Sequence, residues 1–297
     1  MKYLVVGIAN DNDLATWIGK KTGENGVTVY NRKVDNTSLT ILTPTNLQDK
    51  FYALGEILTL ADIAIISTKT LDVNLGESIM AASLLGKEVI LTNDNDISGI
   101  LGKIKLSYKV IEKEKILDEL VAKANLKKIN DELLIEIDKV FPVKGVGLVL
   151  LGIVKSGTVK VHDKLYTRTG KEVQIRSIQV QDEDKEMAEQ GTRVGLAIKG
   201  VEEKDIEKGE ILAKKQIKAV SEIEAELDIN PLQKELSEET QYTLIRGFDT
   251  VPCKITKVEG NKVKIRTGKT IQINSNECSL LIIREHSPKI LSSLKIL

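Results

Sequence analysis

The pattern of apolar and polar positions changes near residue 130. Before this point, short apolar runs rich in β-branched residues alternate with stretches in which apolar residues recur every three or four positions. Continuous apolar runs are typical of strands that are covered on both faces, and the longer spacing is typical of helices that pack on a sheet. The alternation of the two predicts an α/β domain with a mostly parallel sheet.

The predicted elements of this part follow from the same pattern. Strands are expected at Tyr3–Val6, Val27–Tyr30, Leu39–Leu42, Ile63–Ser67, Val89–Thr92 and Tyr108–Ile111, and helices from about Leu14 and over Leu47–Leu60, Leu75–Leu85 and Ile116–Leu126. The polar segment Asn31–Thr37 lies between two of the strands, which predicts an antiparallel hairpin there.

From Leu133 onward the pattern indicates short antiparallel strands separated by turn residues. The strands are expected at Leu148–Val154, Thr158–Val161, Val173–Val180, Arg193–Ile198, Lys254–Val258, Lys262–Arg266, Thr270–Ile273 and Leu280–Arg284. Thr267–Gly268 predicts a hairpin turn between two of them. About 160 residues of this kind suit two small β-barrels. We therefore expect three domains, at 1–130, 131–216 and 217–297.

Composition narrows the functional classes. The 297 residues are 41% hydrophobic and 29% charged, with 43 basic and 43 acidic side chains, which suits a globular protein and argues against a strongly basic DNA-binding protein. No apolar run reaches the roughly 18 to 20 residues of a membrane span. Two cysteines without metal-binding spacing suit reduced thiols in the cytoplasm, and two distant histidines support neither a zinc site nor histidine catalysis.

The loop after the first predicted strand has the position of a phosphate-binding loop but a different chemistry. Residues Gly7–Leu14 are G-I-A-N-D-N-D-L, where the nucleotide-binding motif is G-x-x-x-x-G-K-[ST]. Asn12, Asp13 and Leu14 replace the second glycine, the lysine and the hydroxyl residue. A carboxylate repels a polyphosphate and a leucine cannot bind Mg²⁺. On these residues alone, an ordinary loop with an aspartate helix cap is favoured.

Two longer segments contain several glycine motifs in a fixed order. Val140–Val161 contains V-F-P-V-K-G-V-G-L-V and then L-G-I-V-K-S-G-T-V-K-V, and Gly191–Ala213 contains G-T-R-V-G-L-A-I-K-G-V and I-E-K-G-E-I-L-A. Together they resemble the second domain of translational GTPases, the group of elongation factor Tu and the selenocysteine-specific factor SelB. His162–Asp163 stands where that pattern has Gly-Asp. The resemblance implies a P-loop-NTPase-like parallel sheet domain followed by two antiparallel barrels.

The other motifs of a G domain are degenerate at the positions that the resemblance assigns. The D-x-x-G element falls on Thr43–Asn46, where Thr43 and Asn46 replace the two functional residues. The N-K-x-D element falls on Asn93–Asp96, which keeps Asn93 and Asp96 but has Asp94 in place of the lysine. A polar loop with an Asx turn is the simpler interpretation of this segment. The predicted hairpin also leaves no length for the first switch loop.

The resemblance therefore implies a SelB-like or Tu-like translation protein that is a pseudo-GTPase: not an enzyme, without a cofactor or metal, cytoplasmic and monomeric. Its expected partner is tRNA or the ribosome, with Lys144, Lys155, Arg176 and Arg193 as candidate phosphate contacts. Each of the four is equally understood as a solubilising charge. A regulatory or scaffolding protein that does not bind RNA, and a GTP-binding factor with an unorthodox pocket, stay open as alternatives. The end at Leu297, after the third barrel, does not support recognition of an mRNA element.

Overall fold

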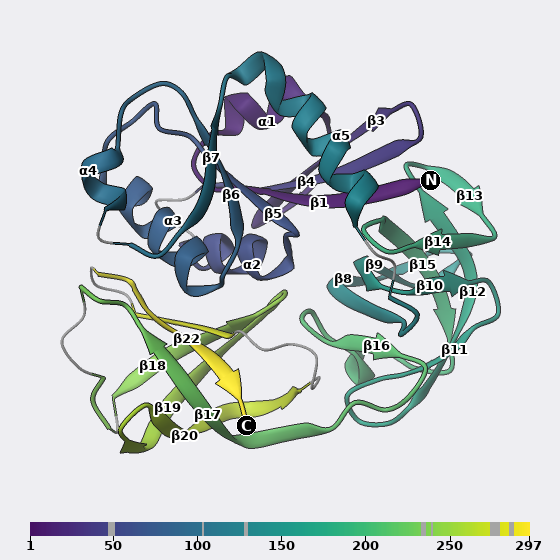
Figure 1. Ribbon diagram of the computed structural model, residues 1–297. Coiled ribbons are helices and arrows are strands. Elements are labelled where there is room, and N and C mark those ends of the chain that lie inside the picture. Colours follow the sequence, from purple (N-terminus) through teal and green to yellow (C-terminus); the bar gives the residue numbers. More distant parts are fainter. Residues whose placement is uncertain are drawn as a thin grey trace.

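Three parts make up the molecule: an α/β domain and two β-barrels, which lie below it at the right and at the lower left in Figure 1. The computed structural model describes residues 1–46, 51–102, 104–127, 130–232, 236–238, 240–273, 280–284 and 288–297. Within these ranges, no helix has both the length and the apolar character needed to cross a membrane.

The first domain is built on a seven-stranded sheet in the order β2-β3-β4-β1-β5-β6-β7. Its strands are β1 (Lys2–Ile8), β2 (Lys20–Asn25), β3 (Val27–Val34), β4 (Thr37–Pro44), β5 (Ile63–Ile66), β6 (Glu88–Thr92) and β7 (Ser107–Ile111). All run in the same direction as β1 except β3, which pairs antiparallel with both β2 and β4 at one edge of the sheet. The predicted hairpin between Val27 and Leu42 is confirmed.

Helices cover both faces of this sheet. They are α1 (Asn12–Ile18), α2 (Tyr52–Leu60), α3 (Val73–Leu84), α4 (Ser98–Leu101) and α5 (Ile116–Leu126), with a 3₁₀ turn, η1 (Lys113–Lys115), before α5. Successive side chains of a strand point to opposite faces. Leu4 and Val6 of β1 accordingly share a core with α1 and α5, whereas Val5 shares one with α2 and α3.

The first barrel consists of β8 (Leu134–Val143), β9 (Gly147–Ser156), β10 (Thr158–Lys160), β11 (Lys164–Tyr166), β12 (Glu172–Val180), β13 (Glu183–Lys185), β14 (Met187–Glu189), β15 (Arg193–Lys199) and β16 (Ile211–Ala213), with the 3₁₀ turn η2 (Glu203–Asp205) before β16. The order of its main sheet is β11-β16-β8-β9-β15-β12-β13, and an additional pairing of β11 with β12 closes the ring. β10 pairs separately with β14.

The second barrel is closed in the order β17-β20-β19-β18-β21-β22. Its strands are β17 (Ala219–Ile229), β18 (Gln241–Arg246), β19 (Asp249–Glu259), β20 (Lys262–Gln272), β21 (Leu280–Ile283) and β22 (Ile290–Ile296). The two barrels follow the parallel sheet domain in the chain, so the predicted fold class is confirmed.

One predicted turn is wrong. Thr267 and Gly268 do not end a strand, because β20 continues through them to Gln272. The side chain of Thr267 extends the buried series begun by Val263 and Ile265. Gly268 does not have the positive φ that a tight hairpin turn needs. The segment is instead a bulge, at which the pairing with β17 shifts register.

Among the elements that were not predicted, two in the first domain have a weak pattern. β2 was not predicted because its side chains are mostly exposed and no apolar alternation marks it. α4 is a single turn and is too short for a periodic pattern. The predicted helix Leu47–Leu60 corresponds to α2 from Tyr52 onward, and positions 47–50 lie outside the described residues.

His162, which stands where the family pattern has a glycine, has a backbone conformation that normally favours glycine. His162 has a φ of 73°, in the left-handed region that favours glycine. The turn between β10 and β11 thus keeps the conformation that suits the glycine of the family pattern, although a histidine occupies it.

Candidate functional site

The carboxyl ends of the parallel strands meet at one edge of the first sheet, where ligands of open α/β sheets bind. Two adjoining hollows lie there, with volumes of about 420 and about 360 Å³. The larger, which we call the phosphate-side hollow, is lined by Ala9–Asp13, Pro44–Asn46, Ser67, Lys69, Thr70, Asp72 and Asn74. The base-side hollow is lined by Asp11, Asp13, Leu14, Lys69, Thr92–Asp94 and Glu112–Glu114.

Side-chain hydrogen bonds hold the loop between β1 and α1. Asn10 exchanges two hydrogen bonds of 2.9 Å with the backbone of Ser67, one as donor and one as acceptor. Asp11 caps α1 by accepting from the backbone N–H of Leu14 at 2.8 Å. The side chain of Leu14 is buried in the core beneath the loop. The loop is therefore capped as expected, and the Leu14 N–H is already used by a carboxylate.

The other phosphate-side positions are also engaged in contacts within the domain. Gly7 lies inside β1, and a Cβ at this position would be 3.1 Å from the Cβ of Ala61 and 3.3 Å from the carbonyl oxygen of Ile57. Thr43 is fully buried, and its hydroxyl donates to Oδ1 of Asn12 at 2.6 Å. This hydrogen bond joins the loop after β1 to the end of β4. Asn46 lines the same hollow.

The segment after β6 forms a compact polar loop. Thr92 donates to the carboxylate of Asp94, and the backbone N–H groups of Asp94 and Asn95 donate to the hydroxyl of Thr68 at 3.1 Å. Asp96 accepts from the backbone N–H of Ser98 at 2.9 Å, and this bond holds the pKa of the Asp96 carboxyl below its usual value. The predicted Asx-type loop is thus observed.

The charge around the base-side hollow is predominantly negative. Among its described lining residues, Asp11, Asp13, Asp94, Glu112 and Glu114 face Lys69 and Lys113. Glu112 pairs with Lys115 at 2.7 Å, and the ammonium group of Lys113 lies 5.1 Å from the centre of the Trp17 ring. A carboxylate 4 Å from a phosphate charge costs about 1 kcal/mol in water and about 4 kcal/mol at an effective dielectric constant of 20.

These observations do not fit a GTP–magnesium complex. The lysine position holds Asp13, the hydroxyl of Thr43 is used by Asn12, and Leu14 points into the core. Among the residues that the structure describes, no group of three or more metal-binding side chains converges on a common point. The loop between β1 and α1 therefore supplies neither the lysine nor the magnesium ligand of a phosphate-binding loop, and the lysine at the phosphate-side hollow is Lys69 from the loop after β5.

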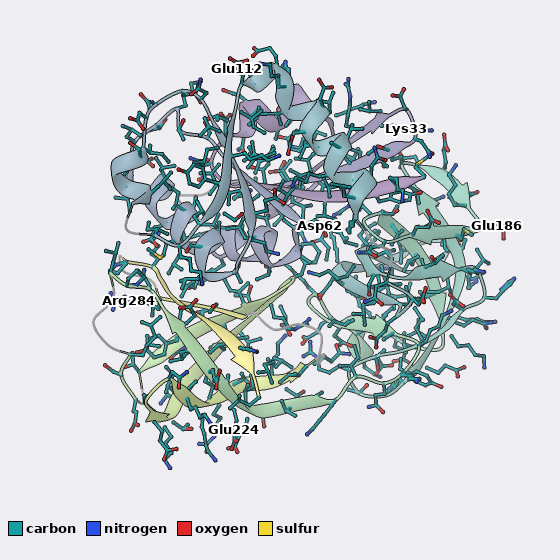
Figure 2. The ribbon with its side chains drawn as sticks, in the orientation of Figure 1. Lys33, Asp62, Glu112, Glu186, Glu224 and Arg284 are labelled. Carbon is teal, nitrogen blue, oxygen red and sulfur yellow. The ribbon has the colours of Figure 1, made fainter. Side chains whose placement is uncertain are left out.

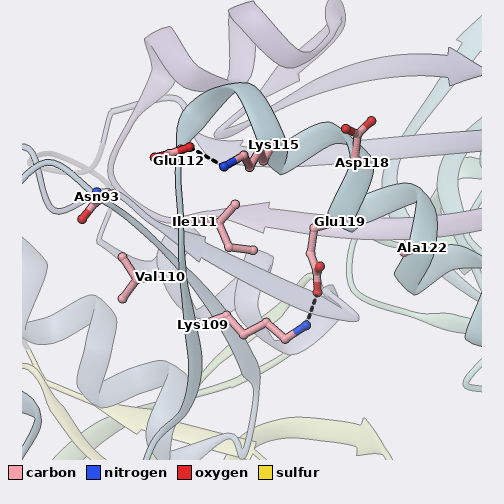
Figure 3. Close-up of a pocket in the computed structure, with 9 residues that line it drawn as sticks. All are labelled: Asn93, Lys109, Val110, Ile111, Glu112, Lys115, Asp118, Glu119 and Ala122. Atoms are coloured by element: carbon pink, nitrogen blue, oxygen red, sulfur yellow. Dashed lines mark hydrogen bonds and ion pairs between the residues drawn. The ribbon is translucent and has the colours of Figure 1, made fainter.

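A larger hollow of about 880 Å³ lies between β7 and α5 and contacts the same region through Asn93 (Figure 3). Two ion pairs border it, Lys109 with Glu119 at 2.6 Å and Glu112 with Lys115 at 2.7 Å. Its charged side chains are mostly exposed and partly neutralise one another. Among its described lining residues, no groups are arranged in a way suited to acid–base or nucleophilic catalysis.

The four basic residues proposed as phosphate contacts separate into two groups. Lys155 donates to the carbonyl oxygen of Thr59 in α2 at 2.8 Å, and Arg193 pairs with the buried Asp138 at 2.8 Å. Both therefore have a structural role. Lys144 and Arg176 are exposed, and Arg176 donates to the carbonyl oxygen of Val146 at 2.9 Å.

Two residues of the site were not predicted from the sequence. Lys69 lines both hollows from the loop after β5, and the buried Thr68 connects that loop to the loop after β6. Neither lies in a motif, and the hydrogen-bond partners of Thr68 at the end of β6 and after it are 24 or more residues away. Only the parallel pairing of β5 with β6 brings them together.

Comparisons with known proteins agree with this architecture. Residues 147–213 match the family described as elongation factor Tu domain 2. The chain is 30% identical over 298 residues to the uncharacterized protein MJ0325 of Methanocaldococcus jannaschii, covering 95% of this chain and 96% of that protein. It is also 30% identical over 220 residues to the selenocysteine-specific elongation factor of the same organism, but covers only 47% of that protein.

The similarity in structure extends over all three domains. The translation elongation factor SelB from Methanococcus maripaludis, in complex with the GTP analogue GppNHp, superposes with a TM-score of 0.81 at 20% identity. The alignment covers 100% of this chain and 79% of SelB. The full-length relative, the second-domain match and the shared three-domain fold together place this chain in the translational GTPase family.

Proposed function

We propose that this protein is a translation-associated pseudo-GTPase, which binds tRNA or the ribosome but does not use GTP as a switch. The proposal combines the architecture of the family with a first domain whose nucleotide positions have changed chemistry. Losing the lysine and the magnesium ligands removes several interactions that stabilise phosphate charge. GTP hydrolysis is therefore not expected of this chain.

The carboxylates at the two hollows are the principal support for this proposal. Asp13 and Asp94 stand where the family pattern has lysines, and Asp11 adds a third negative charge beside them. Asp96, the retained base-reading residue, already accepts the N–H of Ser98. A bound guanine would have to compete with that hydrogen bond, and its phosphates would face like charges.

RNA binding would fall to the barrels. Lys144 and Arg176 are exposed and belong to neighbouring parts of the first barrel, because Arg176 donates to Val146 only two residues from Lys144. Two exposed cations on neighbouring segments can contact a phosphate backbone. Arg193 and Lys155 are not part of this surface, since both are used within the molecule.

A protein–protein scaffold is the second candidate function. The balanced total of 43 basic and 43 acidic residues favours it, as does the structural use of two of the four candidate cations. Under this alternative, the barrels keep the family architecture without an RNA ligand.

Capture from the native cell, followed by identification of bound RNA and protein, tests the proposal. Enrichment of tRNA or ribosomes is expected, and enrichment of neither would contradict it. Binding of purified tRNA should weaken steeply with salt. Replacing both Lys144 and Arg176 by alanine should lower the slope of log K against log salt by about 2. Lys204→Ala is the matched control, because Lys204 is exposed and pairs with Glu202 on another part of the barrel.

A further inference from the structure

Helix α2 is enclosed by protein on almost every side. Seven of its nine residues are buried, including the charged Glu56. A helix that is buried all round lies inside a larger packed unit and not on a domain surface. Its apolar residues Leu54, Ile57 and Leu58 share one core cluster with residues of the barrels, among them Ile153 and Phe248.

Polar contacts connect α2 to both barrels at once. Lys208 of the first barrel donates to Oε1 of Glu56 at 2.8 Å, and Thr250 of the second barrel donates to the same oxygen at 3.3 Å. One turn further along, Lys155 donates to the carbonyl oxygen of Thr59. A single buried carboxylate therefore lies at the junction of all three domains.

A second carboxylate holds the neighbouring helix. Glu77 of α3 accepts the backbone N–H groups of Lys289 and Ile290 at 2.7 and 3.0 Å, where β22 begins. Glu77 is only 6% exposed, and Ile290 belongs to the same apolar cluster as α2. Two charge-assisted hydrogen bonds on one buried carboxylate define the position of the second barrel against α3.

Strand β4 of the first domain also contacts the first barrel. Thr40 of β4 donates to the carbonyl oxygen of Gly191 in the first barrel at 2.8 Å, in a buried contact. A Cβ at Gly191 would lie 2.8 Å from the Cβ of Tyr3, so the two backbones are closely packed. The first domain therefore contacts the barrels at two separate places, through α2 and α3 and through Thr40. A rotation of the domain about one of these contacts would break the other contact.

We infer that Glu56 and Glu77 form an interdomain clamp, which holds the three domains in one arrangement whether or not a ligand occupies the hollows of the first sheet. This goes beyond the proposed function, because it concerns the relation of the domains and not the partner. The clamp also predicts that the surface of the two barrels stays the same whether or not a ligand binds the first domain.

Distances between spin labels test the clamp directly. Lys33→Cys in the first domain and Glu224→Cys in the second barrel are exposed positions far apart in the molecule, and Glu186→Cys marks the first barrel (Figure 2). Cys278→Ser removes one native thiol. The other, Cys253, is buried, and burial raises its pKa to about 12, so it should resist labelling.

In the labelled protein that keeps Glu56 and Glu77, the distance between the labels at positions 33 and 224 should have one narrow distribution. Millimolar GTP or GDP with Mg²⁺ should not change this distribution. Two distances, or a shift on adding nucleotide, would overturn the inference. Nucleotide binding without a shift would refute only the proposed function and leave the clamp intact.

Removing both carboxylates should loosen the first domain, which then keeps its apolar contacts with the barrels and the hydrogen bond between Thr40 and Gly191. In Glu56→Gln/Glu77→Gln, the 33–224 distribution should broaden or split, while the 186–224 distance between the barrels stays unchanged. Glu88→Gln/Glu119→Gln is the matched control, because these two glutamates pair with lysines within the first domain. Circular dichroism verifies that each variant is folded. An unchanged 33–224 distribution in the folded clamp variant would overturn the role assigned to the two carboxylates.

Discussion

Replacing Lys208 by alanine should destabilise the protein in a manner that depends on pH. The ammonium group of Lys208 lies 2.8 Å from Oε1 of Glu56, whose side chain is only 7% exposed. Without Lys208, the carboxylate keeps the hydroxyl of Thr250 as its hydrogen-bond donor at 3.3 Å. The variant thus leaves a buried negative charge without its cation.

The magnitude follows from the exposure of the two partners. Breaking a fully buried ion pair costs about 3–5 kcal/mol, and an exposed pair contributes about 0.2–1 kcal/mol. The side chain of Lys208 is 37% exposed, so solvent screens part of the interaction. We expect Lys208→Ala to lower the free energy of unfolding by about 1–3 kcal/mol at neutral pH.

The sign of the pH dependence follows from the pKa of Glu56. Burial raises this pKa, and Lys208 opposes the rise, so the variant should have a still higher value. A carboxyl whose pKa is raised in the folded state favours folding below its unfolded pKa and loses that contribution as pH rises through the folded value. The deficit of Lys208→Ala should therefore be small below the ordinary pKa of 4.5 and grow toward neutral pH.

Denaturant unfolding at several pH values measures this deficit. Lys204→Ala is the control, since Lys204 and Glu202 form a pair that is 77% and 72% exposed, and it should change stability little at any pH. Adding Glu56→Gln to Lys208→Ala should remove the pH dependence. A deficit that is constant with pH, or a pH dependence that persists with Gln at position 56, would show that the Glu56 carboxylate is not its cause.

Three further predictions follow from single contacts. His162→Gly should raise the free energy of unfolding by about 0.5–1 kcal/mol, because φ at this turn is 73°; a lower denaturation midpoint would contradict this. Arg246→Met should cost about 3–5 kcal/mol, because it leaves Glu136, 1% exposed, without the guanidinium 3.0 Å away, and added Glu136→Gln should recover part of the loss in the same unfolding assay. In Cys278→Ser, a thiol reagent at pH 8 should modify Cys253 only as the protein unfolds, because burial raises its pKa to about 12; rapid reaction of the folded protein would disagree.

The fold could be predicted from the sequence where buried side chains recur at the regular spacing of a strand or a helix. Strand β1 of the first sheet is apolar on both faces, and its residues Leu4, Val5 and Val6 pack into two different cores. β2 escaped prediction because an exposed edge strand needs no apolar face. The turn expected at Thr267 was wrong because a Thr-Gly pair also suits a bulge within a long strand.

The candidate site could be predicted from the sequence only in part. The family motifs and the predicted strand ends together placed Asp13, Thr43 and Asp94 at the carboxyl edge of the sheet, because loops after parallel strands gather there. The sequence did not reveal that Lys155 is used to hold α2, since its partner Thr59 is 96 residues away. Contacts between domains leave no local pattern, and a basic residue at an interface looks the same in sequence as one on a free surface.

Calorimetric titration with GTP and GDP in the presence of Mg²⁺ measures whether the first domain still binds a guanine nucleotide. The carboxylates of Asp11, Asp13 and Asp94 at the hollows predict no saturable binding in the micromolar range. Micromolar binding that Asp96→Ala abolishes would contradict the account, because the chain would then hold guanine through its retained aspartate and would be a nucleotide-binding member of its family.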